Sequence, residues 1–102
     1  MIVSSFYKYV EIKNPEKFQI EQLDFCKKLG VKGKVLVSKE GVNGSISGTE
    51  EQIKEYKKEL TRNKLFKDLK FKDTISEEHP FRKTIVRVRK EIVSSGLKIE
   101  LR

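Results

Sequence analysis

The 102-residue sequence contains a single cysteine, no tryptophan and no long apolar run. One cysteine excludes a disulfide within the chain and suits a reducing compartment. A membrane-spanning helix needs about 20 consecutive apolar residues, and no stretch of this sequence approaches that length. We therefore expect a single-domain cytoplasmic protein with no membrane partner.

Residue types that commonly perform catalysis are scarce as well. The one histidine, His79, lies in a polar stretch, and the one cysteine, Cys26, falls on the apolar stripe of a predicted helix. A metal site needs three or four converging ligands, which these two residues on different elements do not provide. A buried thiol with a raised pKa is the expected state of Cys26. The sequence has no Ser-His-Asp order and no phosphate-binding loop with its lysine, so we expect no metal, no cofactor and no catalytic residue.

Acidic residues are outnumbered: 23 Lys and Arg against 15 Asp and Glu give a formal net charge of +8. The excess is uneven, because residues 1–50 have 8 basic and 6 acidic groups while residues 51–102 have 15 and 9. A basic half attracts polyanions through counterion release and long-range steering. Nucleic acid is therefore the first partner to consider, although a lysine-rich surface can also serve solubility alone.

The order of apolar patterns predicts an α+β domain. Strands are expected at residues 2–10, 35–37, 45–47, 69–75 and 84–89, and helices at residues 15–29 and from residue 49 to a frayed end at 61–63. Between the central strands, Glu40 to Gly44 is predicted to form a turn with positive φ at Asn43 and Gly44. The order β-α-β-β-α-β-β is typical of a ferredoxin-like fold, an antiparallel sheet with two helices on one face. Residues 76–80 are predicted as a polar turn and residues 90–95 as a helical turn.

Helical periodicity predicts which side chains form the core. The residues expected to bury the first helix are apolar and share one face: Phe18, Ile20, Leu23, Phe25, Cys26 and Leu29. In the second helix Ile53, Tyr56 and Leu60 recur at helical spacing, while the intervening lysines and glutamates face water. With both helices on one side, the other face of the sheet is left for solvent or a ligand, and such open sheets commonly hold RNA.

Basic side chains on the late strands are the strongest candidate binding site. Because a strand has a period of two, Lys70 shares a face with Lys72, and Arg87 with Arg89. The predicted nucleic-acid-binding residues are Lys70, Lys72, Arg82, Lys83, Arg87, Arg89 and Lys90. Few aromatic residues are interleaved with them, which favours recognition of backbone shape over base stacking. A charged sheet edge that resists aggregation would show the same pattern, and this alternative stays open.

Several separated motifs resemble those of one known family. They are S-F-Y-K-Y-V at 5–10, D-F-C-K-K-L-G-V-K-G at 24–33, V-S-K-E-G-V-N-G-S-I-S-G at 37–48, F-K-D-L-K-F-K at 66–72, H-P-F at 79–81 and V-R-V-R-K-E-I-V at 86–93. Together they resemble the N-terminal acylphosphatase-like domain of the rhodanese-related tRNA uridine hydroxylase family, formerly an uncharacterised protein family. The family hallmarks Glu40, Gly41, Asn43, Gly44 and Ser45 form a corner without a defined role.

The resemblance implies a domain over residues 1–96 and, at 97–102, the start of a linker to a rhodanese-like domain that this sequence lacks. It also implies that the parent enzyme hydroxylates the wobble uridine of certain tRNAs with molecular oxygen. The catalytic cysteine of the family belongs to the rhodanese-like domain, so Cys26 takes no catalytic role from the resemblance. Whether the chain is an excised domain or a protein without that second half stays open.

We therefore expect an accessory domain that helps present tRNA to a catalytic domain. A small acylphosphatase-like hydrolase and a structural or self-association module are the alternatives. Acylphosphatases use an arginine in a glycine-rich loop after the first strand and an asparagine late in the second. Here residues 10–14 contain neither arginine nor glycine, and Val37 stands near the position of that asparagine. An apolar side chain does not orient an attacking water, which argues against acyl phosphate hydrolysis.

Overall fold

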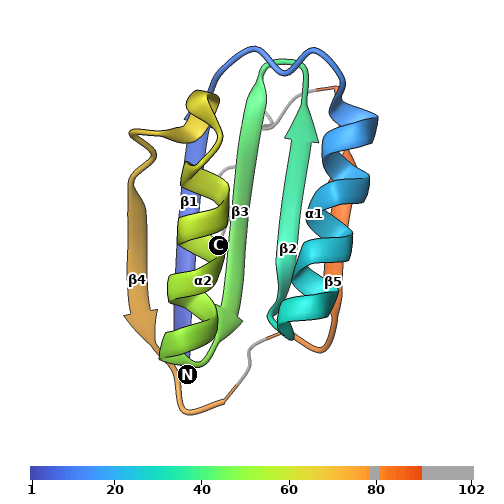
Figure 1. Ribbon diagram of the computed structural model, residues 1–102. Helices are drawn as coiled ribbons and strands as arrows, with labels where there is room; N and C mark the ends of the chain where they lie inside the picture. The colour runs from blue at the N-terminus through green and yellow to red at the C-terminus, as the bar shows by residue number, and fades with distance from the viewer. Residues whose placement is uncertain (79–80, 91–102) are drawn as a thin grey trace, which may run out of the picture.

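A computed structural model describes residues 1–78 and 81–90 of the chain. It has two layers, a five-stranded sheet and two helices packed on one of its faces (Figure 1). The elements are β1 (Ile2–Tyr9), α1 (Pro15–Leu29), β2 (Lys32–Ser38), β3 (Gly41–Gly48), α2 (Glu50–Thr61), the short 3-10 helix η1 (Lys64–Phe66), β4 (Phe71–Ile75) and β5 (Thr84–Val88). The ferredoxin-like fold expected from the sequence is confirmed. His79 and most of the predicted helical turn at 90–95 lie outside the described residues.

Local capping interactions fix the ends of both helices where the sequence predicts them. The Asn14 side chain accepts a hydrogen bond from the Lys17 backbone N–H, and α1 ends at Gly30, which has φ of 88°. Thr49 and Gln52 form a reciprocal capping box at the start of α2. Such caps satisfy backbone N–H groups that the helix itself leaves without partners, so short-range sequence is sufficient to place these boundaries.

The sheet has the order β4-β1-β3-β2-β5. Four strands pair antiparallel, as expected, whereas β5 pairs parallel with β2, with Val35 opposite Val86. The sheet is therefore mixed rather than wholly antiparallel. Strands β2 and β5 both run opposite to β4. These two neighbouring strands are therefore parallel to each other.

The central hairpin is present, but its predicted turn was placed too late in the chain. β2 and β3 are joined at Lys39 and Glu40, and the predicted turn residues Asn43 and Gly44 lie within β3. No non-glycine residue in the described part of the chain has positive φ. A Cβ on Gly44 would lie 2.8 Å from the Phe6 ring, so this glycine is needed for close packing rather than for turning.

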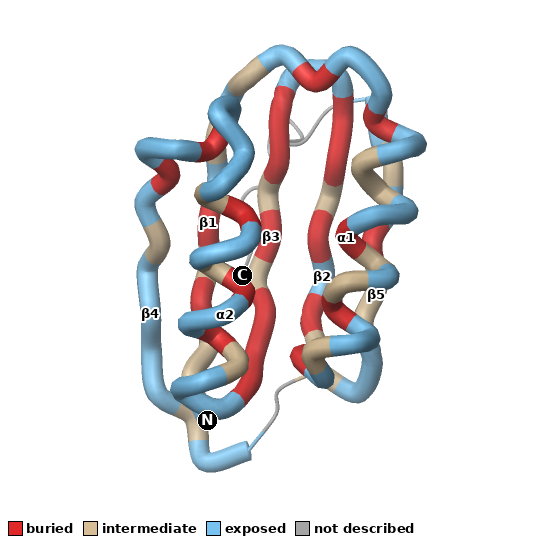
Figure 2. Tube along the Cα trace, viewed as in Figure 1, coloured by how far each residue is buried: buried red, intermediate tan, exposed pale blue. Residues whose placement is uncertain are grey.

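The core lies between the sheet and the two helices, where buried segments of the strands face α1 and α2 (Figure 2). Ile53, Tyr56 and Leu60 of α2 are buried, as predicted. In α1 the expectation for Ile20 is wrong, because this side chain is 67% exposed. Gln22 is buried on that helix instead, and its amide oxygen accepts a hydrogen bond of 2.7 Å from the Tyr56 hydroxyl. That hydrogen bond lets a polar side chain occupy a core position.

Candidate nucleic-acid interface

Alternating strand residues separate the helix-covered face of the sheet from an open face. Phe6 packs against Tyr56 of α2, with ring centroids 5.9 Å apart, so its odd-numbered neighbours in β1 point away from the helices. Strand register extends this assignment across the sheet. The larger side chains of the open face are those of Val3, Tyr7, Tyr9, Lys32, Lys34, Leu36, Asn43, Lys72, Ile85 and Arg87, with Lys70 and Arg89 directly beside the ends of β4 and β5. This face is turned away from the viewer in Figure 1.

One member of each predicted basic pair, Lys72 and Arg87, lies on this face by strand register, at its two edges. Lys72 is opposite Ser5 of β1, and Arg87 is opposite Leu36 of β2, while both lysine and arginine side chains are exposed. Four interstrand steps of about 4.8 Å separate β4 from β5, so the cationic edges are roughly 19 Å apart. A central hydrogen bond of 2.7 Å joins the hydroxyls of Ser5 and Ser45. The sheet thus places positive charge on both sides of a polar centre.

The strand residues of this face include no acid, and the acidic side chain shown to act on it is that of Glu40, at the turn, whose charge contributes to the raised pKa of Tyr7. Among the residues of the five described strands, Asp73 is the one acidic residue, and it faces the helices. There it accepts hydrogen bonds from Ser4 and Lys57. Burial raises the pKa of Asp73, but these two donors outweigh that effect and hold the pKa below its usual value. The carboxylate therefore stays ionised without opposing the cations of the open face.

The remaining predicted basic residues lie at the rim. Arg82 and Lys83 precede β5 and are exposed, and the Lys83 carbonyl accepts a hydrogen bond from the Gly33 N–H. Arg89 and Lys90 line a separate depression of about 420 Å³ beside the start of α1, together with Lys39 and the acidic Glu16. These positions surround the open face rather than forming its centre.

The family hallmarks of the central hairpin do not form one corner. Glu40 is in the two-residue turn, where its carbonyl accepts a hydrogen bond from the Val10 N–H. Gly41 begins β3 and lies close to neighbouring backbone. Gly44 lies within β3 and close to Phe6. Asn43 and Ser45 instead lie on the open face, opposite Tyr7 and Ser5 of β1. Asn43 and Ser45 therefore belong to the candidate interface, and the Glu40 charge acts on its Tyr7.

Two tyrosines and two lysines of this face were not among the predicted site residues. Tyr7 is 46% exposed and Tyr9 is 55% exposed, and their rings meet edge to face with centroids 5.2 Å apart. A hydrogen bond with Tyr9 is the main cause that raises the pKa of Tyr7 to about 12, so its phenol is neutral at neutral pH. Lys32 and Lys34 extend the positive charge along β2. The signal was present in the period-two spacing of residues 7 and 9 and of residues 32 and 34.

A depression of about 580 Å³ lies between β4, β1 and β3 on the open face. Its lining includes Tyr7, the two central serines and, on one side, Lys70 and Lys72. This volume lies in the range of protein sites that hold small ligands. Aromatic, hydroxyl and ammonium groups together suit a ligand with a planar ring and a negative charge.

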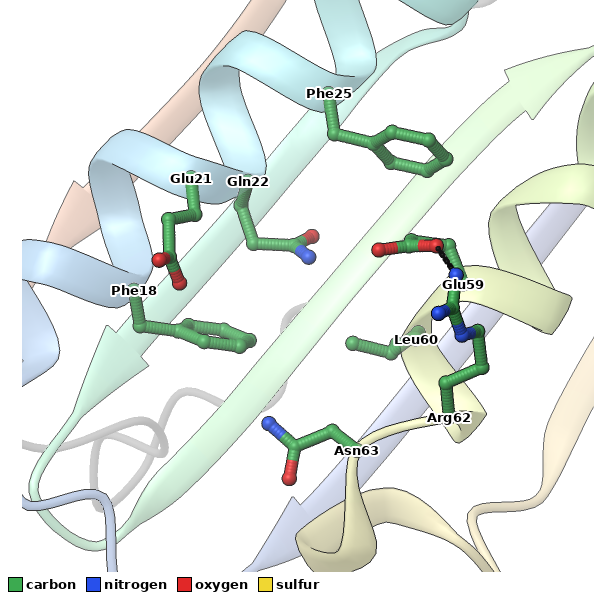
Figure 3. A pocket seen from close by; sticks show the side chains of 8 residues that line it. All are labelled: Phe18, Glu21, Gln22, Phe25, Glu59, Leu60, Arg62 and Asn63. Carbon is green, nitrogen blue, oxygen red and sulfur yellow. Dashed lines mark hydrogen bonds and ion pairs between the residues drawn. The ribbon is translucent and has the colours of Figure 1, made fainter.

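A second depression, of about 510 Å³, opens between α1 and α2 on the opposite side of the molecule (Figure 3). Phe18 and Phe25 of α1 line it opposite Leu60 of α2, and Arg62 donates to the Glu59 carboxylate across 3.0 Å. The one arginine here is thus already paired with a carboxylate. This groove lacks the surplus positive charge that an anion site requires.

Cys26 and Val37, two positions weighed for catalysis in the sequence, are both fully buried. Burial raises the pKa of the Cys26 thiol to about 12, which leaves it unreactive at neutral pH, as predicted. Val37 is fully buried and points toward the helices, so it does not contact solvent. Within residues 1–78 and 81–90, no three His, Cys, Asp or Glu side chains gather as metal ligands would. None of the described helices combines the length and apolar character required to cross a membrane.

Comparisons with known proteins give the same fold and a family. A relative from Bacillus licheniformis, named tRNA uridine(34) hydroxylase, is 47% identical over 96 residues, which cover 94% of this chain and 30% of the relative. The chain thus spans about 30% of the length of the curated relatives it matches.

Two solved structures share the fold at low sequence identity. The BlrP1 BLUF structure has a TM-score of 0.67 at 17% identity, over 86% of this chain and 64% of that one. An acylphosphatase from Coxiella burnetii has a TM-score of 0.52 at 13% identity, over 86% and 90% of the two chains. The family model described as the UPF0176 acylphosphatase like domain matches residues 1–92. With nine-tenths of its length matched by that model, the chain belongs to the UPF0176 acylphosphatase-like domain family.

Proposed function

We propose that this chain is an accessory RNA-binding domain of a larger cytoplasmic enzyme that hydroxylates tRNA, and that its open face contacts the tRNA. The relatives named tRNA uridine(34) hydroxylase support the substrate, and the short span of the match supports a separate catalytic domain. The motif resemblance suggests that this partner domain is rhodanese-like and follows a linker near residues 97–102. The chain itself then performs no turnover.

The observation that carries the proposal is the positive charge of the strand residues on the open face. Its strand residues include Lys72 at one edge, Arg87 at the other and two lysines of β2, with no acid, whereas α1 has three acidic and three basic residues. Lys34, Lys72 and Arg87 form no ion pair with another described residue. Unpaired cations on one surface release counterions when they meet phosphates, which drives binding to nucleic acid.

Titration of unmodified tRNA with the 102-residue chain tests this proposal. The Lys34→Ala, Lys72→Ala, Arg87→Ala triple variant is compared with a Lys27→Ala, Lys54→Ala, Lys58→Ala control. The control residues are exposed on the helices, so both variants lose the same charge. We expect binding at low salt that the first variant weakens by roughly tenfold or more and the control barely changes.

Equal weakening by both triple variants would show that net charge alone matters, and would remove the role of the open face. Hydrolysis of benzoyl phosphate by the chain would favour the hydrolase alternative instead. A concentration-dependent dimer that ignores tRNA would favour the self-association alternative. Thermal unfolding of each variant confirms that the fold is intact, since all six side chains are on the surface.

A further inference from the structure

Tyr7 and Tyr9 are large exposed aromatic side chains near the end of β1, the second strand of the sheet, and neither is among the buried core residues. Their edge-to-face contact, with an interplanar angle of 80°, fixes both rings relative to each other. A ring held in place loses little conformational freedom when a ligand stacks on it. The pair is therefore a preorganised aromatic surface.

Positive charge flanks this aromatic surface directly. Lys70 and Lys72 line the same depression as Tyr7, and both lysine side chains are exposed. The period-two spacing of the two lysines points both ammonium groups to the open face. The two acids nearest in sequence are each paired with another lysine, Asp68 with Lys8 and Asp73 with Lys57, while the Glu40 charge also acts on Tyr7. A phosphate beside Tyr7 would thus meet two cations.

The volume and the aromatic and cationic lining of the site favour an unpaired base. In a duplex the bases stack on one another, so a tyrosine on a flat face reaches phosphates and sugars but not the ring faces. A depression of about 580 Å³ accepts a base that has been turned out of the stack. Stacking tolerates any base, because every base presents a π face.

We propose that this depression holds one unpaired nucleotide of the bound RNA, with its base stacked on Tyr7 and its phosphate between Lys70 and Lys72. This inference rests on the proposed function and narrows it, because it replaces recognition of backbone shape alone by recognition of single-stranded RNA. The loops of a folded RNA, not its stems, are then the segments that contact the open face.

The composition of the chain provides a direct probe. It has three tyrosines and no tryptophan, and Tyr56 is fully buried. Tyrosine fluorescence quenched by a stacked base therefore reports on Tyr7 and Tyr9. The experiment titrates the 102-residue chain with a mixed-sequence single-stranded RNA of about 12 nucleotides and with the same strand in a duplex, and follows both fluorescence and anisotropy of the labelled RNA.

We expect tighter binding of the single strand, with quenching that saturates together with binding. Tyr7→Leu should weaken single-strand binding roughly 5- to 100-fold, as expected for loss of one stacked base. Tyr7→Phe keeps the ring and should retain most of the affinity. Ile20→Ala, which shortens an exposed apolar side chain on α1, is the matched control and should change nothing.

The outcomes separate this inference from the proposed function. Single strand and duplex could bind equally and without quenching, while the Lys34, Lys72 and Arg87 triple variant loses affinity. That result would overturn the proposal of a stacked nucleotide and would leave the proposed RNA-binding face intact. Absence of binding to either RNA at low salt overturns both. If Tyr7→Leu fails to fold, fluorescence quenching in the wild type and the affinity of the Tyr7→Phe variant still test whether a base stacks on Tyr7.

Discussion

Gly44 shows how the role of a residue can be predicted wrongly when a tertiary contact, rather than a local turn, requires that residue. Asn-Gly is a strong local turn signal, but here the glycine lies inside β3 beneath the ring of Phe6, and a Cβ would also lie 3.0 Å from a Val35 methyl group. Nothing in the neighbouring sequence specifies that contact, because Phe6 is distant in the chain. The same reasoning applies to Gln22, whose burial depends on the Tyr56 hydroxyl.

We predict that Gly44→Ala destabilises the domain by about 1–3 kcal/mol, because the added methyl group forces Phe6 out of its position. Urea unfolding measures the change. Ser45→Ala, one residue further on the open face, serves as the control and should cost less than about 1 kcal/mol. A Gly44→Ala variant as stable as the wild type would show that Phe6 can move without loss.

The buried thiol of Cys26 should make stability depend on alkaline pH. Burial raises its pKa from an ordinary value of 9.0 to about 12. Between these values the unfolded chain has released the proton that the folded chain keeps, so the free energy of unfolding falls as pH rises, by up to about 1.4 kcal/mol per pH unit. Burial raises the pKa of Tyr56 as well, which adds to the fall above pH 10.0.

Denaturant unfolding at several pH values between 9 and 12 checks this expectation. Cys26→Ala removes the titrating group, so its stability should fall less steeply with pH than that of the wild type. Parallel curves for the two proteins would mean that the thiol ionises without unfolding.

At the scale of elements, β4 depends on a polar contact with α2. Asp73 accepts from the Ser4 hydroxyl at 2.6 Å and from Lys57, whose ammonium group also lies 5.2 Å from the centre of the Phe71 ring. Because Ser4 is fully buried, loss of Asp73 would leave its hydroxyl without this partner. This contact holds the strand that presents Lys72.

Asp73→Ala should therefore lower the free energy of unfolding by about 1–2 kcal/mol, measured by urea unfolding. The ion pair with Lys57 adds little to this figure, because both side chains are partly exposed. Adding Ser4→Ala to Asp73→Ala should recover part of the loss, since no buried hydroxyl then remains unpaired. If the double variant is less stable by the sum of both single changes, the hydrogen bond is not the cause.

The elements also show which parts of the fold short-range sequence determines. Asn14, Thr49 and Gly30 cap helices through groups a few residues away, so both helices were predicted correctly. The parallel pairing of β5 with β2 joins residues about 50 positions apart, and no local pattern specifies it. The same distinction holds for the candidate site. The period-two spacing of the sequence predicted that Lys70 and Lys72 share a face, whereas only the strand register placed Tyr7 and Lys34 on that face as well.

For the whole molecule, RNA affinity should depend on salt through the number of open-face cations. The logarithm of the binding constant should fall linearly with the logarithm of salt concentration. Each cation removed from the open face should reduce that slope by roughly 0.7–0.9. Anisotropy titrations of Lys34→Ala, Lys72→Ala and Arg87→Ala at several salt concentrations test this, with Lys54→Ala as the control. An unchanged slope in the three variants would place the phosphates elsewhere.

The one-sided placement of charge described for the sheet has a further consequence for encounters. The helical layer is close to neutral, with three basic and four acidic residues in α2, while the far side of the sheet is positive. The molecule consequently has an electric dipole directed across its thickness. The electric field of a polyanion exerts a torque on this dipole, so that rotational diffusion is biased and the tyrosine-bearing side turns toward the phosphates before the surfaces touch.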